Sequence, residues 1–240
     1  MFSCGVCHSP SSSPHLGILV CRACTLFYRS LSVARLFQFA TAVFDRFNCL
    51  SVQEKWEIVS HFYHSFFSLD STHRGLKLFP DYDKVLCCGY TSYMDLNDCQ
   101  AFFRDRKCKN EVEACEFIKN SQTDDVVRVR MIMKEVAMED EEFIALLGIQ
   151  LLHSDGLPLS DDVISDMEAM RASLLHELHV YYRSEKGERD YAARIGQLYD
   201  MIANLKEFSA KFKEDVEIFR LLDVFEDDCN IYRIVRDVRI

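Results

Sequence analysis

The chain has 240 residues, of which 49% are hydrophobic and 28% charged, so it can bury a sizeable core and is not a disordered chain. With only 8 Gly and 4 Pro, the composition disfavours a turn-rich β sandwich and favours long helices. Its 11 cysteines follow a start that lacks a secretory pattern, and no apolar run reaches the roughly 18 residues that span a bilayer. We therefore expect a reducing compartment, thiols that bind metal or lie buried, and no membrane partner.

The formal net charge of −10 is distributed unevenly along the chain. Residues 1–35 carry three arginines and no acidic residue, whereas the rest carries 25 basic and 38 acidic residues, a net charge of −13. A strongly acidic body repels nucleic acid, so any contact with DNA has to come from the small basic N-terminal part. We expect these two parts to do different jobs.

Two Cys-x-x-Cys pairs stand out in the N-terminal part: Cys4 with Cys7, and Cys21 with Cys24, with 13 residues between the pairs. In a reducing compartment this spacing can fold four thiolates into a tetrahedron around a zinc ion. The alternative is four unrelated buried or free thiols. Few large apolar residues accompany the pairs, so residues 1–32 cannot build a core alone and are predicted to form a small zinc module.

After residue 32 the sequence changes to long periodic segments. Apolar residues recur at helical spacing over residues 33–48 and again after Ser51, which predicts two amphipathic helices. Helix-breaking residues at Gly75 and Pro80 are followed by a predicted β-hairpin over residues 85–95. The hairpin is the only sheet structure that the sequence predicts.

Helical patterns resume near Asp95 and continue in pieces to Leu152. Ser160 is a plausible N-cap for the next helix, which Gly187 ends. The longest predicted helix covers residues 190–222, where apolar residues alternate at spacings of four and three, and a run of about 30 residues makes a rod of roughly 45 Å. The predicted fold class is mainly α.

The segment after the second Cys pair, residues 22–29, places arginines beside two aromatic residues. A helix that begins at zinc ligands can enter the major groove of DNA, where Arg reads guanine or binds phosphate. Two or three arginines are weak support, since helix arginines are usually only solvated. Tyr90, Tyr93 and Met94 could line a ligand cavity, and ordinary core packing is the alternative.

The two Cys pairs and the segment CRACTLFYR resemble the first zinc module of nuclear hormone receptors, in the divergent style of nematode receptors. Residues 47–56 resemble the signature of the receptors' ligand-binding domain, and residues 142–225 resemble its last four helices in order. The resemblance covers nearly the whole chain. It implies a partial zinc-finger module over residues 1–32 and an all-α helical-sandwich ligand-binding domain with one short β-hairpin over residues 33–240.

The resemblance implies a non-enzymatic, nuclear transcription regulator with bound zinc. Its implied partners are DNA, another receptor or a second copy in a dimer, coregulators and a small apolar ligand. The implied DNA contacts are made by residues around the second Cys pair: Arg22, Ala23, Thr25, Leu26 and Arg29. The longest helix would form the dimer interface, with Phe212 and Phe219 as the positions left for a partner; the alternative is that its whole apolar seam is core.

The sequence also departs from the family pattern. No second four-Cys module follows the first, and Thr25 and Ser30 stand where the family has cations, so we expect weak DNA binding. Residues 230–236 lack the Glu of the family's activation helix. The alternative function is therefore a truncated receptor that does not bind DNA and acts as a partner of full-length receptors or coregulators. An enzyme is disfavoured, because the sequence contains none of the common catalytic motifs. His153-Ser154-Asp155 could be part of a triad and His176 with His179 a metal pair, but histidines three residues apart on a helix are usually a solvated face.

Overall fold

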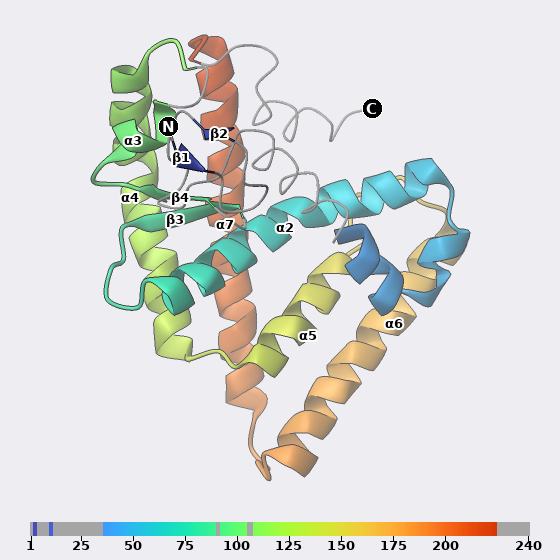
Figure 1. Cartoon of the computed structure of the whole chain (residues 1–240). Helices are drawn as coiled ribbons and strands as arrows, with labels where there is room; N and C mark the ends of the chain where they lie inside the picture. Colours follow the sequence, from blue (N-terminus) through green and yellow to red (C-terminus); the bar gives the residue numbers. More distant parts are fainter. Residues whose placement is uncertain (1, 4–9, 12–35, 90–91, 105–107, 225–240) are drawn as a thin grey trace.

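The computed structural model describes residues 2–3, 10–11, 36–89, 92–104 and 108–224, which form a mainly helical fold with two short strand pairs (Figure 1). Its helical elements in chain order are a helix over residues 36–43, η1 (Asp45–Cys49), α2 (Val52–Leu78), α3 (Cys99–Phe103), α4 (Glu111–Val136), α5 (Asp140–Leu151), α6 (Asp161–Val180), the π-helical turn η2 (Tyr181–Glu185) and α7 (Ala192–Leu221). The predicted mainly α fold is confirmed for this part of the chain.

The predicted hairpin is present as β3 (Val85–Gly89) and β4 (Ser92–Asp95), which pair antiparallel. Leu86 lies opposite Met94 in the register, and both side chains are buried against the helical core. The hairpin packs on α2, so it covers part of the central helix. A second antiparallel pair, β1 (Phe2–Ser3) with β2 (Pro10–Ser11), was not predicted from the sequence.

Helix α2 is the central element, because α4, α5, α7 and β3 all pack against it (Figure 1). It begins at Ser51, whose hydroxyl accepts a hydrogen bond from the Glu54 amide at 3.2 Å while the Glu54 carboxylate accepts one from the Ser51 amide at 2.8 Å. Residues 68–73 are buried without exception, polar side chains included. A helix surrounded on several sides buries more than one face, so its sequence pattern is less strictly amphipathic.

Helices α4 and α7 lie side by side, and α5 separates α2 from the outer helix α6 (Figure 1). The helix predicted over residues 190–222 is present as α7, and each of its ends lies within two residues of the prediction. Ser160 is the N-cap of α6 as predicted, although its side chain makes no capping hydrogen bond. Gly187, with a φ of 68°, follows the end of the same helical segment. No helix in the described ranges is both long and apolar enough to cross a membrane.

Two predicted helices differ from the structure in their extent. Gly75 was expected to break the helix that follows Ser51, but α2 continues through it to Leu78. The periodic segment 33–48 was expected to be one helix, but the structure has a helix over residues 36–43 and then the 3-10 turn η1. Phe44 separates the two, because its backbone is extended, with φ −121° and ψ 99°. Phe44 and Phe47 are both buried, so this break lets two aromatic side chains reach the core from one short connection.

Candidate functional site

The predicted zinc and DNA-binding residues lie outside the described part of the chain, so their predicted roles stay predictions. They are the ligands Cys4, Cys7, Cys21 and Cys24 and the DNA-contacting residues Arg22, Ala23, Thr25, Leu26 and Arg29. Residues 230–236, at the position of the activation helix, lie outside it as well. Among the residues that are described, no group of three metal-binding side chains lies close enough to hold an ion.

The predicted interface residues on α7 have different environments. Phe219 is 1% exposed and its ring contacts that of Phe117 on α4, with ring centroids 5.0 Å apart. Phe212 is partly buried and stacks on Phe67 of α2 at 5.2 Å. The expectation that Phe219 is left for a partner is therefore wrong, because α4 already covers its ring. Phe212 is mostly engaged with α2 within the same chain.

Large exposed apolar side chains are instead found at the C-terminal end of α7 and the N-terminal end of α4. Ile218 is 37% exposed, Leu221 78% and Leu222 50%, and Val112 on α4 is 55% exposed. The two helix ends are joined, because the Lys109 amide donates to the Val224 carbonyl oxygen at 2.8 Å. We call Val112, Ile218, Leu221 and Leu222 the terminal apolar patch. Figure 1 shows these ends of α4 and α7 at the same end of the molecule.

A buried ion pair links α5 to α7. Glu142 is 1% exposed, and Arg194 donates from Nε to Oε1 at 2.7 Å and from Nη2 to Oε2 at 2.6 Å. Tyr182, in η2, donates its hydroxyl to the same carboxylate, and the Glu139 amide donates to it at 2.8 Å. Arg194 also donates to the carbonyl oxygens of Val136 and Ala137 at the end of α4. This network therefore ties four elements together.

Burial by itself raises the pKa of the Glu142 carboxyl, but the hydrogen bonds from Arg194, Tyr182 and the Glu139 amide outweigh it, so the pKa lies below its ordinary value. Burial and the bond to Glu142 raise the pKa of the Tyr182 hydroxyl far above its ordinary range, which keeps that hydroxyl a donor. The network thus consists of the ionised Glu142 and Arg194 side chains, with Tyr182 as a further donor to the carboxylate. Such an arrangement stabilises the fold and offers no group for chemistry.

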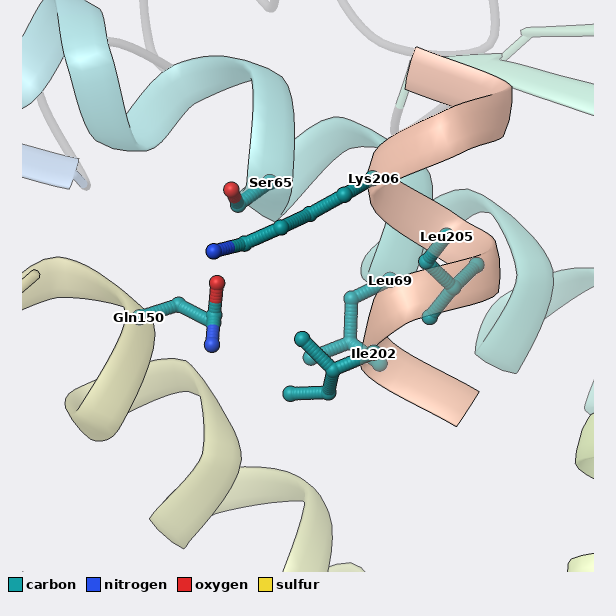
Figure 2. Close-up of a pocket in the computed structure, with 6 residues that line it drawn as sticks. All are labelled: Ser65, Leu69, Gln150, Ile202, Leu205 and Lys206. Atoms are coloured by element: carbon teal, nitrogen blue, oxygen red, sulfur yellow. The ribbon is translucent and has the colours of Figure 1, made fainter. Parts of the chain in front are cut away.

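A small pocket lies where α2, α5 and α7 meet (Figure 2). It is lined by Ser65, Leu69, Gln150, Ile202, Leu205 and Lys206. Figure 2 shows the Ser65 hydroxyl, the Gln150 side-chain oxygen and the Lys206 ammonium gathered at one side of the pocket, and the aliphatic side chains at the other. Its volume of about 10 Å³ holds one water-sized group, far below the several hundred Å³ that enclose a hormone-sized ligand.

Two of the three residues considered as cavity lining lie in the described part of the chain, and both pack against neighbouring side chains. Met94 is 4% exposed and belongs to the core, and Tyr93 is 37% exposed with its ring 4.9 Å from that of Phe79. Tyr90 lies outside the described residues. Of the helix histidines considered in the sequence, His179 is on an exposed surface, where its Nδ1 contacts the Tyr191 hydroxyl at 3.0 Å.

The family model of the ligand-binding domain of nuclear hormone receptor matches residues 24–222, which is most of the chain. The chain therefore belongs to the nuclear hormone receptor ligand-binding domain family. Nuclear hormone receptors regulate transcription by binding and catalyse no reaction, so the expectation of a non-enzymatic protein is confirmed at the level of the family. The match begins at Cys24, before the boundary predicted at residue 32, and that boundary stays a prediction.

Two proteins of Caenorhabditis elegans are similar to the chain. Nuclear hormone receptor family member nhr-43 is 25% identical over 169 residues, which cover 67% of this chain and 37% of the relative. Nuclear hormone receptor family member nhr-53 is 22% identical over 206 residues, which cover 82% of this chain and 54% of the relative. The chain thus spans about half or less of the length of these curated relatives. The resemblance to divergent nematode receptors is confirmed.

Sequence reasoning missed the polar side chains of the α2–α5–α7 pocket and the pair of Glu142 with Arg194. One signal could have suggested the pair: Glu142 lies one residue before a strongly apolar run, where an unpaired carboxylate would be costly. Gln150 sits inside the same apolar run. Neither position identifies its neighbours on α7, because these lie more than 50 residues further along the chain.

Proposed function

We propose that the chain regulates transcription through contacts with other proteins, and that it pairs with a second receptor-type chain through the terminal apolar patch. The observation that carries this is the 78% exposure of Leu221, with Leu222 and Val112 also exposed at the same end of the α4–α7 layer. Large apolar side chains that share an exposed surface mark interaction sites on soluble proteins. Apolar anchors surrounded by polar residues are also the side chains that carry most binding free energy at interfaces.

The family membership supports pairing as the mode of action. The α2–α5–α7 pocket is too small to enclose a small apolar ligand, so this pocket gives no support to regulation by an enclosed hormone. Coregulators and related receptors are the other partners we propose, and the nucleus is the place of action. The simplest partner to test is a second copy of the chain.

The test is Leu221→Glu in the full chain, measured by sedimentation equilibrium at micromolar concentration. We expect a wild-type dimer and a monomeric variant with unchanged thermal melting, because Leu221 is exposed and a charge there is buried only in the dimer. Ile144→Glu is the matched control, since Ile144 is 59% exposed on α5, away from the patch. A wild-type monomer, or equal disruption by Ile144→Glu, would contradict the proposed interface.

We further propose that Cys4, Cys7, Cys21 and Cys24 hold one zinc ion and that any DNA binding comes from this N-terminal part. The paired spacing and the three arginines of residues 1–35 support this. The charge of −13 on the remaining residues works against DNA binding, since each lost phosphate contact lowers affinity steeply at physiological salt. The same charge favours the alternative function, a receptor-like partner that does not bind DNA.

A further inference from the structure

The α2–α5–α7 pocket contains one buried polar atom without a hydrogen-bond partner. Gln150 is 4% exposed, and its Oε1 is buried without a hydrogen-bond partner. Figure 2 shows this oxygen directed toward the ammonium of Lys206 and the hydroxyl of Ser65. A buried acceptor without a partner costs roughly 1–3 kcal/mol, so its retention at the end of α5 calls for a group that fills the space beside it.

A second buried polar atom without a hydrogen-bond partner belongs to His153, which contacts the pocket residue Lys206. The Lys206 Nζ is 3.3 Å from the His153 Nε2, and an ammonium can only donate, so Nε2 accepts and the proton of the neutral ring is on Nδ1. That Nδ1 is buried and has no hydrogen-bond partner. The pocket lining itself presents an ammonium and a hydroxyl as donors, from Lys206 and Ser65, and one amide oxygen as acceptor, from Gln150.

The charges around the pocket are mainly positive, although the chain carries a net charge of −10. From α2, the ring of His61 lies tilted against that of His153, with ring centroids 6.0 Å apart. From α7, Lys206 and Lys213 act electrostatically on His61, and from α6 Arg171 acts on His153. The acidic group in the set is Asp155, whose carboxylate is 3.5 Å from the His153 Nε2 and 85% exposed.

Burial and then these neighbouring cations lower the pKa of both His61 and His153, and burial lowers the pKa of the Lys213 ammonium. Lys206, Lys213 and Arg171 therefore disfavour a further positive charge on either imidazole ring. An anion beside Lys206 would be attracted by these cations and could accept hydrogen bonds from the Lys206 ammonium and the Ser65 hydroxyl.

We propose that the α2–α5–α7 pocket binds a phosphate group, with Lys206 and Ser65 donating to its oxygens and the Gln150 Oε1 accepting from its hydroxyl. The enclosed volume of about 10 Å³ admits one oxygen atom, so the rest of the phosphate occupies the open side beside the exposed Lys206. A carboxylate or sulfate ion has acceptors only. Phosphate that keeps one proton has both acceptors and a donor, which matches the two donors and the one acceptor of the lining.

The test uses the full chain and two sources of phosphate. Inorganic phosphate is titrated by isothermal calorimetry, and phosphatidylcholine vesicles with and without phosphatidic acid are tested by co-sedimentation. We expect saturable binding in at least one arm, weakened about tenfold in Lys206→Met, because a hydrogen bond to a charged group contributes about that much. Lys119→Met, which removes an exposed lysine on α4, should change binding less than about twofold.

Binding of inorganic phosphate in the calorimeter would identify free phosphate as the ligand. Binding only to the vesicles that contain phosphatidic acid would identify a lipid headgroup. A second variant tests the role of the acceptor. Gln150→Met should fold as well as wild type, since it removes an unpartnered oxygen, and it should abolish the preference for phosphate over sulfate. No saturable binding in either arm, or equal binding by wild type and Lys206→Met, would overturn the proposal.

Discussion

Arg194, near the start of α7, holds both carboxylate oxygens of Glu142, on α5, at 2.7 Å and 2.6 Å, although the two residues lie 52 positions apart in the sequence. Two parallel hydrogen bonds fix the orientation of both groups as well as their distance. Arg194 also contacts the last carbonyl oxygens of α4, so one guanidinium sets where α4 ends and where α5 and α7 meet.

Glu142→Gln should destabilise the fold by about 3 kcal/mol, since it leaves the Arg194 charge largely buried without its counter-charge. Because the pKa of Glu142 is lowered in the folded state, the stability that its ionised form contributes is present above its ordinary pKa and is lost as pH falls through the lowered value. The variant should therefore also lose less stability on acidification than wild type. Urea denaturation at several pH values measures both effects.

Arg220→Gln is the control for this prediction. Arg220 pairs with Glu217 three residues earlier on α7, with side chains 41% and 46% exposed, and such surface pairs contribute about 0–1 kcal/mol. Equal losses of stability in the two variants would show that the pair of Glu142 with Arg194 contributes no more than a surface contact.

Local signals in the sequence predicted where most helices lie, but they could not predict contacts between residues far apart in the sequence. The apolar pattern marked the extent of α7, and Gly187 marked the end of the segment before it, because both depend on neighbouring residues only. The same pattern could not tell that Phe219 is covered while Leu221 is exposed, since the difference depends on Phe117 of another helix. The pairing of Glu142 likewise depends on how α5 and α7 come together.

Two helical glycines should respond to alanine with opposite signs. At Gly196 on α7, an added Cβ meets nothing within 4 Å, so Gly196→Ala should stabilise the protein by about 1 kcal/mol through helix propensity. At Gly75 on α2, an added Cβ overlaps the guanidinium of Arg130. Arg130 is 1% exposed and donates to the Phe79 carbonyl oxygen at 2.7 Å, so it cannot move freely.

Gly75→Ala should therefore destabilise by about 1–3 kcal/mol, the usual cost of forcing extra volume into a packed site. Thermal melting of the two variants beside wild type gives the comparison. Stabilisation by Gly75→Ala as large as that by Gly196→Ala would mean that Arg130 adjusts at no cost.

Asp215 on α7 is a second buried carboxylate, and its pKa is shifted in the opposite direction from that of Glu142. It is 4% exposed, and burial raises its pKa even though Gln122 on α4 donates to it. Since the folded state disfavours the charged form, stability falls as pH rises from the ordinary pKa through the raised one. Asp215→Asn should thus stabilise the protein at neutral pH by about 1 kcal/mol and flatten this part of the pH profile.

Asp125, at the same α4–α7 contact, provides the matched control. Burial acts to raise its pKa, but Lys211 at 2.5 Å and Arg128 at 3.1 Å outweigh it, so its pKa lies below the ordinary value. Asp125→Asn should destabilise the protein at neutral pH, opposite in sign to Asp215→Asn. Destabilisation by Asp215→Asn in urea unfolding at neutral pH would show that its charged form is favoured after all.

The zinc prediction can be tested on the full chain, because the cysteines in its described part provide internal controls. Cys4, Cys7, Cys21 and Cys24 should bind one Co²⁺ with the absorption of a tetrahedral thiolate site, at metal–sulfur distances of about 2.3 Å for the native zinc. Cys4→Ser and Cys24→Ser should each weaken binding, because a four-thiolate site loses a ligand that a hydroxyl does not replace. Each serine variant removes a member of a different Cys-x-x-Cys pair.

Cys49→Ser is the control, since Cys49 is an exposed free thiol on η1, within the described residues in which no metal-binding group of three side chains is found. It should bind Co²⁺ as wild type does. The melting temperature of the helical domain should change little in any of these variants, because its core is built from α2, α4, α5 and α7. Absence of Co²⁺ absorption in the wild-type chain, or equal loss in Cys49→Ser, would show that the paired spacing does not form a zinc site.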